Sequence, residues 1–296
     1  MLGTIEEFQP IAADLAAMFS SVVYRDLAVR TPTVAWDRLR RSASLVPSEG
    51  DATIGDVFEI AHRRLQRDYR NEYVYKNAVV SKIIFGRHRP TTATALLELP
   101  FGRSFADVAV FNGTSTVYEI KTDLDSFARL RSQLSDYTTR AEFVNVVVSE
   151  SRAAAAEEHL PAGVGLLALR RSGALSTIRP AESNLYALSV DHLFRMLRKA
   201  ELHQALREHC GWRLGAPTGD LWYLARAEFT KLDRKLAHRV TVTALRARGR
   251  RIASIVTDPG FPPSIRALAY GTEISNAGAA RLRARLASPV SLVRGL

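Results

Sequence analysis

Two acidic residues and a lysine near the middle of the chain have the types and spacing that metal-assisted hydrolysis needs. Glu119 and Lys121 stand two residues apart in the segment YEIKT, and Asp107 precedes them in the segment ADVAVF. Because side chains alternate between the faces of a strand, Glu119 and Lys121 are expected to share one face. Mg²⁺ prefers carboxylate ligands, and a neighbouring ammonium can stabilise negative charge that develops on a phosphoryl group. The three residues therefore predict Mg²⁺- or Mn²⁺-dependent hydrolysis of phosphodiester bonds.

The turn at Asn112-Gly113 decides whether Asp107 reaches the same face as the other two residues. A two-residue loop would pair Asp107 with Tyr118 and separate the carboxylates. A three-residue loop, Phe111-Asn112-Gly113 with the glycine in the left-handed conformation of a bulge, would pair Asp107 with Val117 and bring the carboxylates together. We predict the three-residue loop.

The alternative for Asp107, Glu119 and Lys121 is an ordinary ion pair on a half-exposed sheet face. We favour the metal site because a strand that otherwise reads as apolar has little other reason to hold an aspartate. The backbone carbonyl of Ile120 offers the metal ion a further hard oxygen. Glu98, in the preceding expected strand, is a competing third carboxylate.

Short runs of apolar and β-branched residues must position these side chains. They predict strands over residues 94–99, 106–111, 116–121, 143–148, 164–169 and 175–178. Residues 123–140 keep helical spacing, so a three-stranded meander, a helix, a strand and a final hairpin follow one another. This order predicts an α/β or α+β core.

The flanks of this core read as helical. Apolar residues recur at helical spacing within residues 1–45, a break follows at Pro47-Ser48-Glu49-Gly50, and Asp51 or Thr53 can cap the next helix. The region after residue 180 also reads as helical, with interruptions at 215–219 and 258–263. We therefore predict three parts, an N-terminal helical segment, a nuclease-like core and a basic, mostly helical region, over residues 1–45, 46–180 and 181–296.

The motif Ala106-Asp107, followed after eleven residues by Glu119-Ile120-Lys121, resembles the PD-(D/E)XK nuclease superfamily, whose fold is also called restriction-endonuclease-like or resolvase-like. The segment from Gln133 to Tyr137 is similar to the Gln-x-x-x-Tyr element of the RecB-like branch. Ala106 departs from the proline of the family name, at a position that is not a ligand. The resemblance covers about residues 55 to 150.

The resemblance implies a core of a helix, three strands, a helix and a strand. It also implies that Asp107 and Glu119 bind Mg²⁺ and that the enzyme cleaves a nucleic-acid backbone. An upstream helical glutamate is usual in such folds, and Glu72 occupies that place; its alternative is an ion pair with Lys76 one turn later. Gln133 and Tyr137 join the predicted catalytic set. Their alternatives are a solvated helix residue and a core aromatic with a polar tip, respectively.

Composition narrows the class of protein. The chain has 296 residues, 47 % of them hydrophobic, and a single cysteine, Cys210. One cysteine excludes an intrachain disulfide and multi-cysteine zinc sites, which fits a reducing compartment. There is no run of eighteen uncharged apolar residues, and the first segment carries glutamates where a secretory signal would be basic. A soluble, cytoplasmic protein without membrane contact is therefore expected.

Positive charge is concentrated toward the end of the chain. The formal net charge is +11, and the segment 182–296 holds 19 Lys and Arg against 9 Asp and Glu, which is +10. Such a region is typical of a surface that meets a polyanion, although arginines on solvated helix faces are the alternative. Nucleic acid, DNA rather than RNA, is the expected partner, and a homodimer would suit cleavage of both strands. The candidate phosphate contacts are Arg246, Arg248, Arg250, Arg251, Arg281 and Arg285.

The sequence leaves two functions open. The first is a Mg²⁺-dependent nuclease acting on DNA. The second is a catalytically idle module that keeps the nuclease fold and binds nucleic acid or a protein partner in a regulatory or defence role. An idle site has no physical need for a lysine beside two carboxylates, which favours the nuclease.

Overall fold

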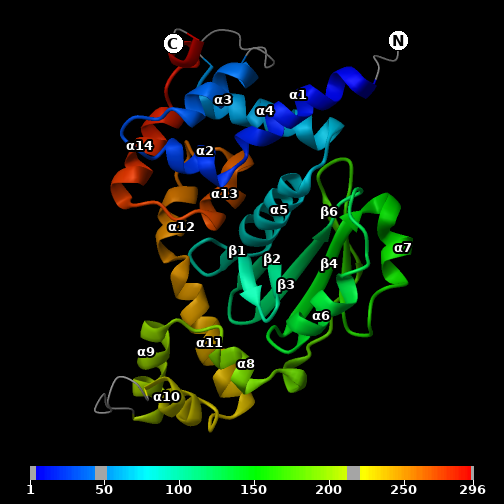
Figure 1. The fold of residues 1–296 in the computed structure, drawn as a ribbon, viewed down its shortest axis with the longest axis vertical. Coiled ribbons are helices and arrows are strands. Elements are labelled where there is room, and N and C mark those ends of the chain that lie inside the picture. The colour runs from blue at the N-terminus through cyan, green and yellow to red at the C-terminus, as the bar shows by residue number, and fades with distance from the viewer. Residues whose placement is uncertain (1–4, 44–51, 212–220, 295–296) are drawn as a thin grey trace. The chain divides into compact units, whose positions relative to one another are not determined.

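The chain has a mixed α+β arrangement, with most of its strands grouped between an earlier and a later run of helices (Figure 1). The computed structural model describes residues 5–43, 52–211 and 221–294. The predicted breaks at 47–50 and 215–219 lie outside these residues. The chain divides into two compact units: the first unit comprises residues 1–90, 169–175 and 251–296, and the sheet unit comprises residues 91–168 and 176–250. No helix among the described residues is long and apolar enough to span a membrane.

The first unit is helical, as the periodicity of both flanks predicts. Thr53 caps the helix that starts at Ile54: its hydroxyl accepts a hydrogen bond from the Asp56 amide, and the Asp56 carboxylate accepts one from the Thr53 amide. The helices of this unit are α1 (Ile5–Met18), α2 (Ser21–Asp26), α3 (Val34–Ala43), α4 (Ile54–Asp68), α5 (Glu72–Val80) with the π-helical turn Ser81–Arg87, α12 (Arg250–Val256), α13 (Arg266–Gly271), α14 (Asn276–Leu286) and α15 (Ser291–Arg294).

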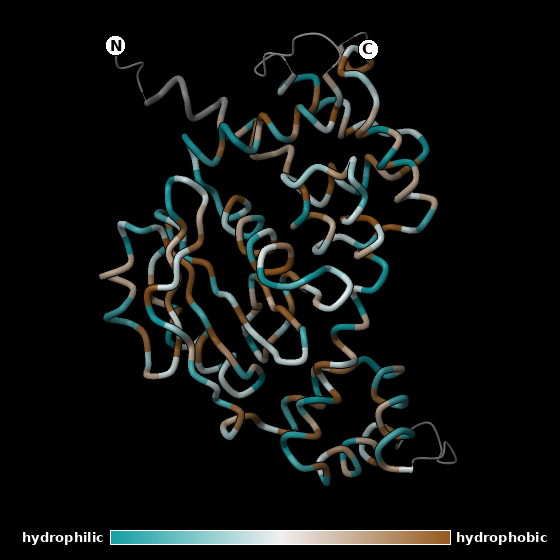
Figure 2. The backbone as a smooth tube through the Cα atoms, turned by 180° about the vertical axis from the view of Figure 1, so that it is seen from behind, coloured by the Kyte–Doolittle hydropathy of each residue, from teal (hydrophilic) through white to brown (hydrophobic). Residues whose placement is uncertain are grey.

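One six-stranded sheet contains all of the predicted strands, in the order in which they follow in the sequence. β1 to β3 form an antiparallel meander, and β4 lies parallel to β3. The strands are β1 (Thr94–Phe101), β2 (Ser104–Phe111), β3 (Ser115–Lys121), β4 (Phe143–Ser149), β5 (Gly165–Leu169) and β6 (Leu175–Arg179). In β4 every residue after the first is buried, as expected for a strand that is covered on both faces. Figure 2 shows hydrophobic and hydrophilic residues along the whole backbone.

The loop between β2 and β3 has three residues, but it starts one residue later than the sequence predicts. Phe111 pairs with Ser115, so the loop is Asn112-Gly113-Thr114, and Gly113 has a φ of 113°. Phe111 stays in the ladder because its ring is buried in the core, and the Asn112 side chain closes the loop by accepting the Thr114 hydroxyl at 2.9 Å. The odd loop length is correct. The predicted pairing of Asp107 with Val117 is wrong, because Val117 pairs with Ala109.

The helix expected over residues 123–140 is shorter than predicted: α6 spans Leu130–Thr138. The Asp125 carboxylate accepts hydrogen bonds from the Thr122 amide at 2.8 Å and from its hydroxyl at 2.6 Å. This side-chain capture offers the backbone a turn in place of a helix. Arg152 holds the turn from the other side by donating to the carbonyl of Asp125 at 2.7 Å.

Helices α6 and α11 (Arg234–Arg248) pack against the sheet in one apolar cluster. Leu130, Leu134 and Tyr137 of α6 and Val242 and Leu245 of α11 are buried there with apolar side chains of β1 to β4. A second cluster joins α11 to α8 (Val190–Phe194), α9 (Lys199–Cys210) and α10 (Leu221–Phe229). The short α7 (Ala153–Glu157) packs near β4. The sheet and its helices therefore hold α6 firmly beside β3, where the predicted site lies.

A buried histidine links α11 to the meander and gives the sheet unit a pH dependence. His238 Nε2 lies 2.7 Å from the hydroxyl oxygen of Ser115, and its Nδ1 lies 3.9 Å from a carboxylate oxygen of Glu142. Burial lowers the pKa of His238, and Glu142 opposes this only in part. Since the unfolded chain takes up this proton more readily, the stability from neutral His238 is fully present above about pH 6.5 and is lost as the pH falls through the lower folded pKa.

We expect the free energy of unfolding of the wild type to fall more steeply with acidification than that of His238→Gln, which cannot take up the proton. Urea unfolding at several pH values would measure this difference. His209→Gln is the matched control, because His209 is exposed near the end of α9. A wild type and a His238→Gln variant with parallel pH profiles would contradict the expectation.

Candidate active site

Glu119 and Lys121 form a buried ion pair on β3. Their side chains lie two residues apart on one face, as alternation predicts, and the Lys121 Nζ is 2.7 Å from Glu119 Oε1. Only 1 % of Glu119 and 7 % of Lys121 is exposed. Glu119 and Lys121 therefore form the ion pair that the alternative names, but the pair is buried and does not lie on a half-exposed face. Charges buried this deeply lose their hydration, so they need further polar partners to be tolerated.

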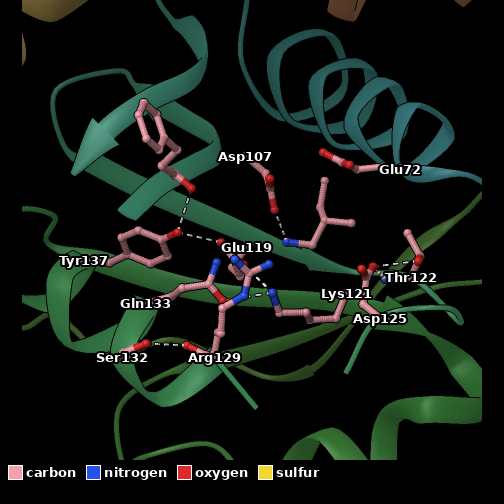
Figure 3. Close-up of polar contacts among 12 residues, drawn as sticks. Glu72, Asp107, Glu119, Lys121, Thr122, Asp125, Arg129, Ser132, Gln133 and Tyr137 are labelled. Carbon is pink, nitrogen blue, oxygen red and sulfur yellow. Dashed lines mark hydrogen bonds and ion pairs between the residues drawn. The ribbon is translucent and has the colours of Figure 1, made fainter. Parts of the chain in front are cut away.

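Two side chains from α6 supply those partners (Figure 3). Gln133 Oε1 accepts a hydrogen bond from Lys121 Nζ at 2.9 Å, and the Tyr137 hydroxyl lies 2.7 Å from Glu119 Oε2. Residues four apart share one face of a helix, which explains why both reach the same ion pair. Gln133 is half-buried and Tyr137 fully buried, so the solvated-residue reading is wrong for Gln133. Tyr137 fits the alternative proposed for it, because it is a core aromatic residue whose hydroxyl contacts Glu119.

Tyr137 acts as a fixed donor to the carboxylate. Its hydroxyl also lies 2.8 Å from the carbonyl oxygen of Phe105, so one hydrogen is shared between two acceptors. Burial raises the pKa of Tyr137 far above its usual range, and the negative charge of Glu119 raises it further. The hydroxyl therefore stays protonated at neutral pH, and Tyr137 holds the orientation of Glu119.

Tyr137→Phe is expected to lower the free energy of unfolding by about 2 kcal/mol, because a buried carboxylate oxygen loses its donor. Urea unfolding measures the change. Tyr186→Phe removes the same atom from a side chain that is 78 % exposed, and it should change stability by less than about 0.5 kcal/mol. Equal effects of the two substitutions would show that the contact with Glu119 contributes nothing.

Asp107 reaches β3 through the backbone. Its Oδ2 accepts a hydrogen bond from the Ile120 amide at 2.7 Å. On β2, Ala106 and Ala109 both pack into the cluster under α6, three residues apart instead of two, so the pleat is interrupted at Asp107. Beyond Val108 and Tyr118 no further pair of the ladder joins β2 to β3 among the described residues. The Asp107 side chain thus takes the place of a ladder carbonyl, and Figure 3 shows it pointing at the strand that carries Glu119 and Lys121.

Glu98 lies opposite Asp107 on β1, between the pairs Leu97 with Val108 and Leu99 with Ala106. Its φ is 51°, which is unusual for a residue with a side chain. Carboxylate oxygens of Glu98 and Asp107 lie within 4.8 Å of each other. Sequence reasoning ranked Glu98 below the other candidates. The tight Gly102-Arg103 turn could have indicated its position, because it sets the register that puts Glu98 across from Asp107.

These residues fit a hard metal ion in part. Glu98, Asp107 and Glu119 offer only carboxylate oxygens, the ligand type that Mg²⁺ prefers. Both oxygens of Glu119 already accept hydrogen bonds, from Lys121 and from Tyr137, although each retains a further lone pair. Asp107 likewise binds the Ile120 amide through one oxygen. Glu119 is not among the acidic residues of the described chain whose oxygens lie within 4.8 Å of those of Glu98 and Asp107. Asp107 and Glu119, with the Ile120 carbonyl predicted beside them, could therefore hold an ion together only if Glu119 turns toward Asp107 and Lys121 moves aside.

Glu72 belongs to the first unit. It is the first residue of α5, its side chain is 56 % exposed, and it forms an ion pair with Lys76 one turn later. This ion pair is the alternative that its helical spacing indicates. A role of Glu72 as a metal ligand stays a prediction.

The predicted phosphate-binding arginines fall into two groups. Arg248 donates to both carboxylate oxygens of Glu201 at 2.7 Å and joins α11 to α9. Arg281 and Arg285 donate to backbone carbonyls of residues 27–30. These three guanidinium groups serve the fold. The remaining three candidates, which are exposed to solvent, are Arg246, Arg250 and Arg251.

Comparisons with known proteins place the site within a matched segment. The family model described as Bacteriophage P4 protein cII matches residues 65–253. A solved structure, described as SPO1766 protein of unknown function from Silicibacter pomeroyi, is similar to 42 % of this chain and 86 % of that chain, with 22 % identity and a TM-score of 0.29. No curated protein matches the chain. The segment 65–253 includes Asp107, Glu119, Lys121, Gln133 and Tyr137, but not Arg281 and Arg285.

Proposed function

The chain belongs to the family of Bacteriophage P4 protein cII, and we propose that it is a Mg²⁺-dependent nuclease that hydrolyses phosphodiester bonds of DNA. One observation carries the proposal: a buried Glu119–Lys121 pair, held by Gln133 and Tyr137, lies on the strand that Asp107 also contacts. A charged pair of this kind is costly to bury. A reaction that uses both charges would explain why the protein retains this buried pair.

The sheet supports the resemblance to PD-(D/E)XK nucleases. A meander of three antiparallel strands is followed by α6 and by β4, which runs parallel to β3. This is the order of strands and helix that the resemblance implies. Asp107 and the Glu119-Ile120-Lys121 motif lie on the two inner strands of the first four, and the Gln-x-x-x-Tyr element lies on α6.

Each side chain then has a definite task. Asp107 and Glu119, with the carbonyl of Ile120, would bind the metal ion, which when bound polarises the scissile phosphoryl group. Lys121 would leave Glu119 to orient the attacking water or to offset the negative charge that grows on the phosphoryl oxygens. Gln133 keeps the Lys121 ammonium near the reacting group, and Tyr137 keeps Glu119 in place.

A cleavage assay tests the proposal. Purified protein would be incubated with linear, branched and single-stranded DNA and with structured RNA, in Mg²⁺, in Mn²⁺ and in EDTA. We expect cleavage of DNA with either metal ion and none with EDTA. Intact substrates under every condition would rule the nuclease out.

A catalytically idle module is the second candidate. It is favoured by the hydrogen bonds that both carboxylate oxygens of Glu119 already accept. Both oxygens of that carboxylate are bound and the side chain is almost completely buried. In this case the nuclease fold would bind nucleic acid or a protein partner in a regulatory or defence role. Such a module should bind nucleic acid equally well after the substitutions Glu119→Gln and Lys121→Met are combined, and it should show no metal-dependent cleavage to lose.

A further inference from the structure

A pocket of about 470 Å³ opens in the sheet unit beside the candidate active site. The tip of the β1–β2 hairpin forms one wall, and the start of α6 forms the other. Its lining consists of Arg103, Ser104, Phe105, Arg129, Ser132, Gln133 and Asp136. Gln133 belongs to both places, because it lines the pocket and also accepts the hydrogen bond from Lys121. A ligand in the pocket is therefore linked to the ion pair through the Gln133 side chain.

The two walls are fixed to each other. The Ser104 hydroxyl donates to Asp136 Oδ2 at 2.8 Å, and the Phe105 carbonyl accepts from Tyr137. Gly102, at a φ of 72°, lets the hairpin tip sit so close to α6 that a Cβ would lie 2.7 Å from an Asp136 oxygen. The pocket is thus a built part of the unit, and its walls need not close on a ligand.

Its chemistry is that of a site for a phosphate and a flat ring. Arg103 and Arg129 are exposed, and no hydrogen bond or ion pair engages either guanidinium within the parts of the chain that the structure describes. Phe105, which also lines the pocket, presents 57 % of its surface to solvent. Asp136, the acidic residue of the lining, is already bound by Ser104 and lies 3.9 Å from the Arg140 guanidinium. Its negative charge is therefore offset.

We propose that this pocket binds an unpaired nucleotide, and that the substrate is consequently single-stranded nucleic acid or a single-stranded part of a longer one. Arg103 and Arg129 bind the phosphates on either side of a base that stacks on Phe105. The role of the neighbouring ion pair in this inference rests on the proposed nuclease function. The choice of a nucleotide as the ligand rests on the residues of the pocket alone.

The exposed ring is what favours a single strand over a duplex. Stacking on an aromatic side chain requires a base whose face is open, and the bases of a duplex already stack on one another. Arginines alone would bind the phosphates of either form. A pocket that pairs both features next to the site selects a strand whose bases are free to turn outward.

Fluorescence anisotropy in EDTA tests the inference, because binding is then separated from cleavage. A short fluorescein-labelled oligothymidylate and a labelled blunt duplex would be titrated with wild type, Phe105→Ala and Phe105→Leu. We expect both variants to bind the oligothymidylate about tenfold more weakly than the wild type, since leucine keeps apolar bulk but offers no ring face. Binding of the duplex should not change.

The arginines give a second, independent readout. For single strands, log affinity falls with log salt, and the magnitude of this negative slope decreases by about 0.7 for each phosphate contact that is lost. Arg103→Ala and Arg129→Ala should each make the slope less steep by about that amount. Arg131→Ala is the matched control, because Arg131 is exposed on α6 and does not line the pocket; its slope should equal that of the wild type.

Several outcomes would overturn the inference while leaving the nuclease intact. These are Phe105 variants that bind the oligothymidylate as tightly as the wild type, equal losses of the Phe105 variants on single strand and duplex, or the same change of slope in Arg131→Ala as in Arg103→Ala and Arg129→Ala. Conversely, a wild type that cuts nothing but shows the expected losses would support the nucleotide pocket and refute the nuclease. The two proposals therefore fail separately.

Discussion

Lys121→Ala is expected to abolish Mg²⁺-dependent cleavage and to destabilise the protein at the same time. Without the ammonium, nothing offsets the charge that develops on the phosphoryl oxygens, and we expect the rate to fall by at least about 100-fold. The substitution also leaves Glu119 as a buried carboxylate with Tyr137 as its remaining side-chain donor. This should lower the free energy of unfolding by about 3 kcal/mol. Single-turnover cleavage and urea unfolding measure the two effects.

A double substitution separates the effect of Lys121 on cleavage from its effect on stability. Glu119→Gln combined with Lys121→Met removes both charges and keeps the approximate shapes, so no unpaired charge stays buried. We expect this variant to recover most of the lost stability and to stay inactive. A Lys121→Ala protein that still cleaves at the wild-type rate would remove Lys121 from the reaction, whatever its stability.

Asp107→Asn should stop cleavage with little change in the fold. The asparagine carbonyl can still accept the hydrogen bond that Asp107 takes from the Ile120 amide. What is lost is the negative charge that would bind the metal ion. We expect a fall in cleavage rate of at least about 100-fold, together with the loss of any rise in melting temperature that Mg²⁺ causes in the wild type.

Asp68→Asn serves as the control for this experiment. Asp68 is a carboxylate at the end of α4 that pairs with Arg67, far along the sequence from the motif. The control should keep both the cleavage rate and the effect of Mg²⁺. If Asp107→Asn behaves like the control, Asp107 does not bind a metal ion.

Alternation along one strand was enough to predict how Glu119 and Lys121 lie together, because β3 is regular over these residues. Only an odd loop between β2 and β3 brings Asp107 to the face of Glu119 and Lys121, whereas Asn112-Gly113 by itself fits a two-residue loop as well. The sequence does not predict the position of the loop, since the burial of Phe111 decides where the ladder ends. The local sequence pattern thus predicts which residues share a face of a strand, whereas burial in the tertiary structure sets how β2 pairs with β3.

The periodicity of the sequence does not predict the irregular parts of the site. The left-handed backbone at Glu98 and the interrupted pleat at Asp107 break the alternation on which strand reasoning depends. Likewise, Asp125 turns residues before α6 away from a helix that their spacing favours. Both cases depend on side-chain contacts with backbone groups, which periodicity does not reveal.

Charge composition predicts a nucleic-acid partner, but it does not predict which guanidinium groups are available to bind one. Arg248 is held by Glu201, whereas the exposed Arg103 and Arg129 lie in a part of the chain whose net charge is close to zero. A regional excess of arginine therefore says little about which guanidinium groups are available. The fold makes that selection.

The central claim is that the Asp107, Glu119 and Lys121 site cleaves DNA with a divalent metal ion. The most direct test is a time course of cleavage of labelled single-stranded DNA by the wild type and by Asp107→Asn, in Mg²⁺ and in EDTA. The account predicts product only with the wild type in Mg²⁺. Intact DNA in all four reactions, or equal product from the two proteins, would contradict it.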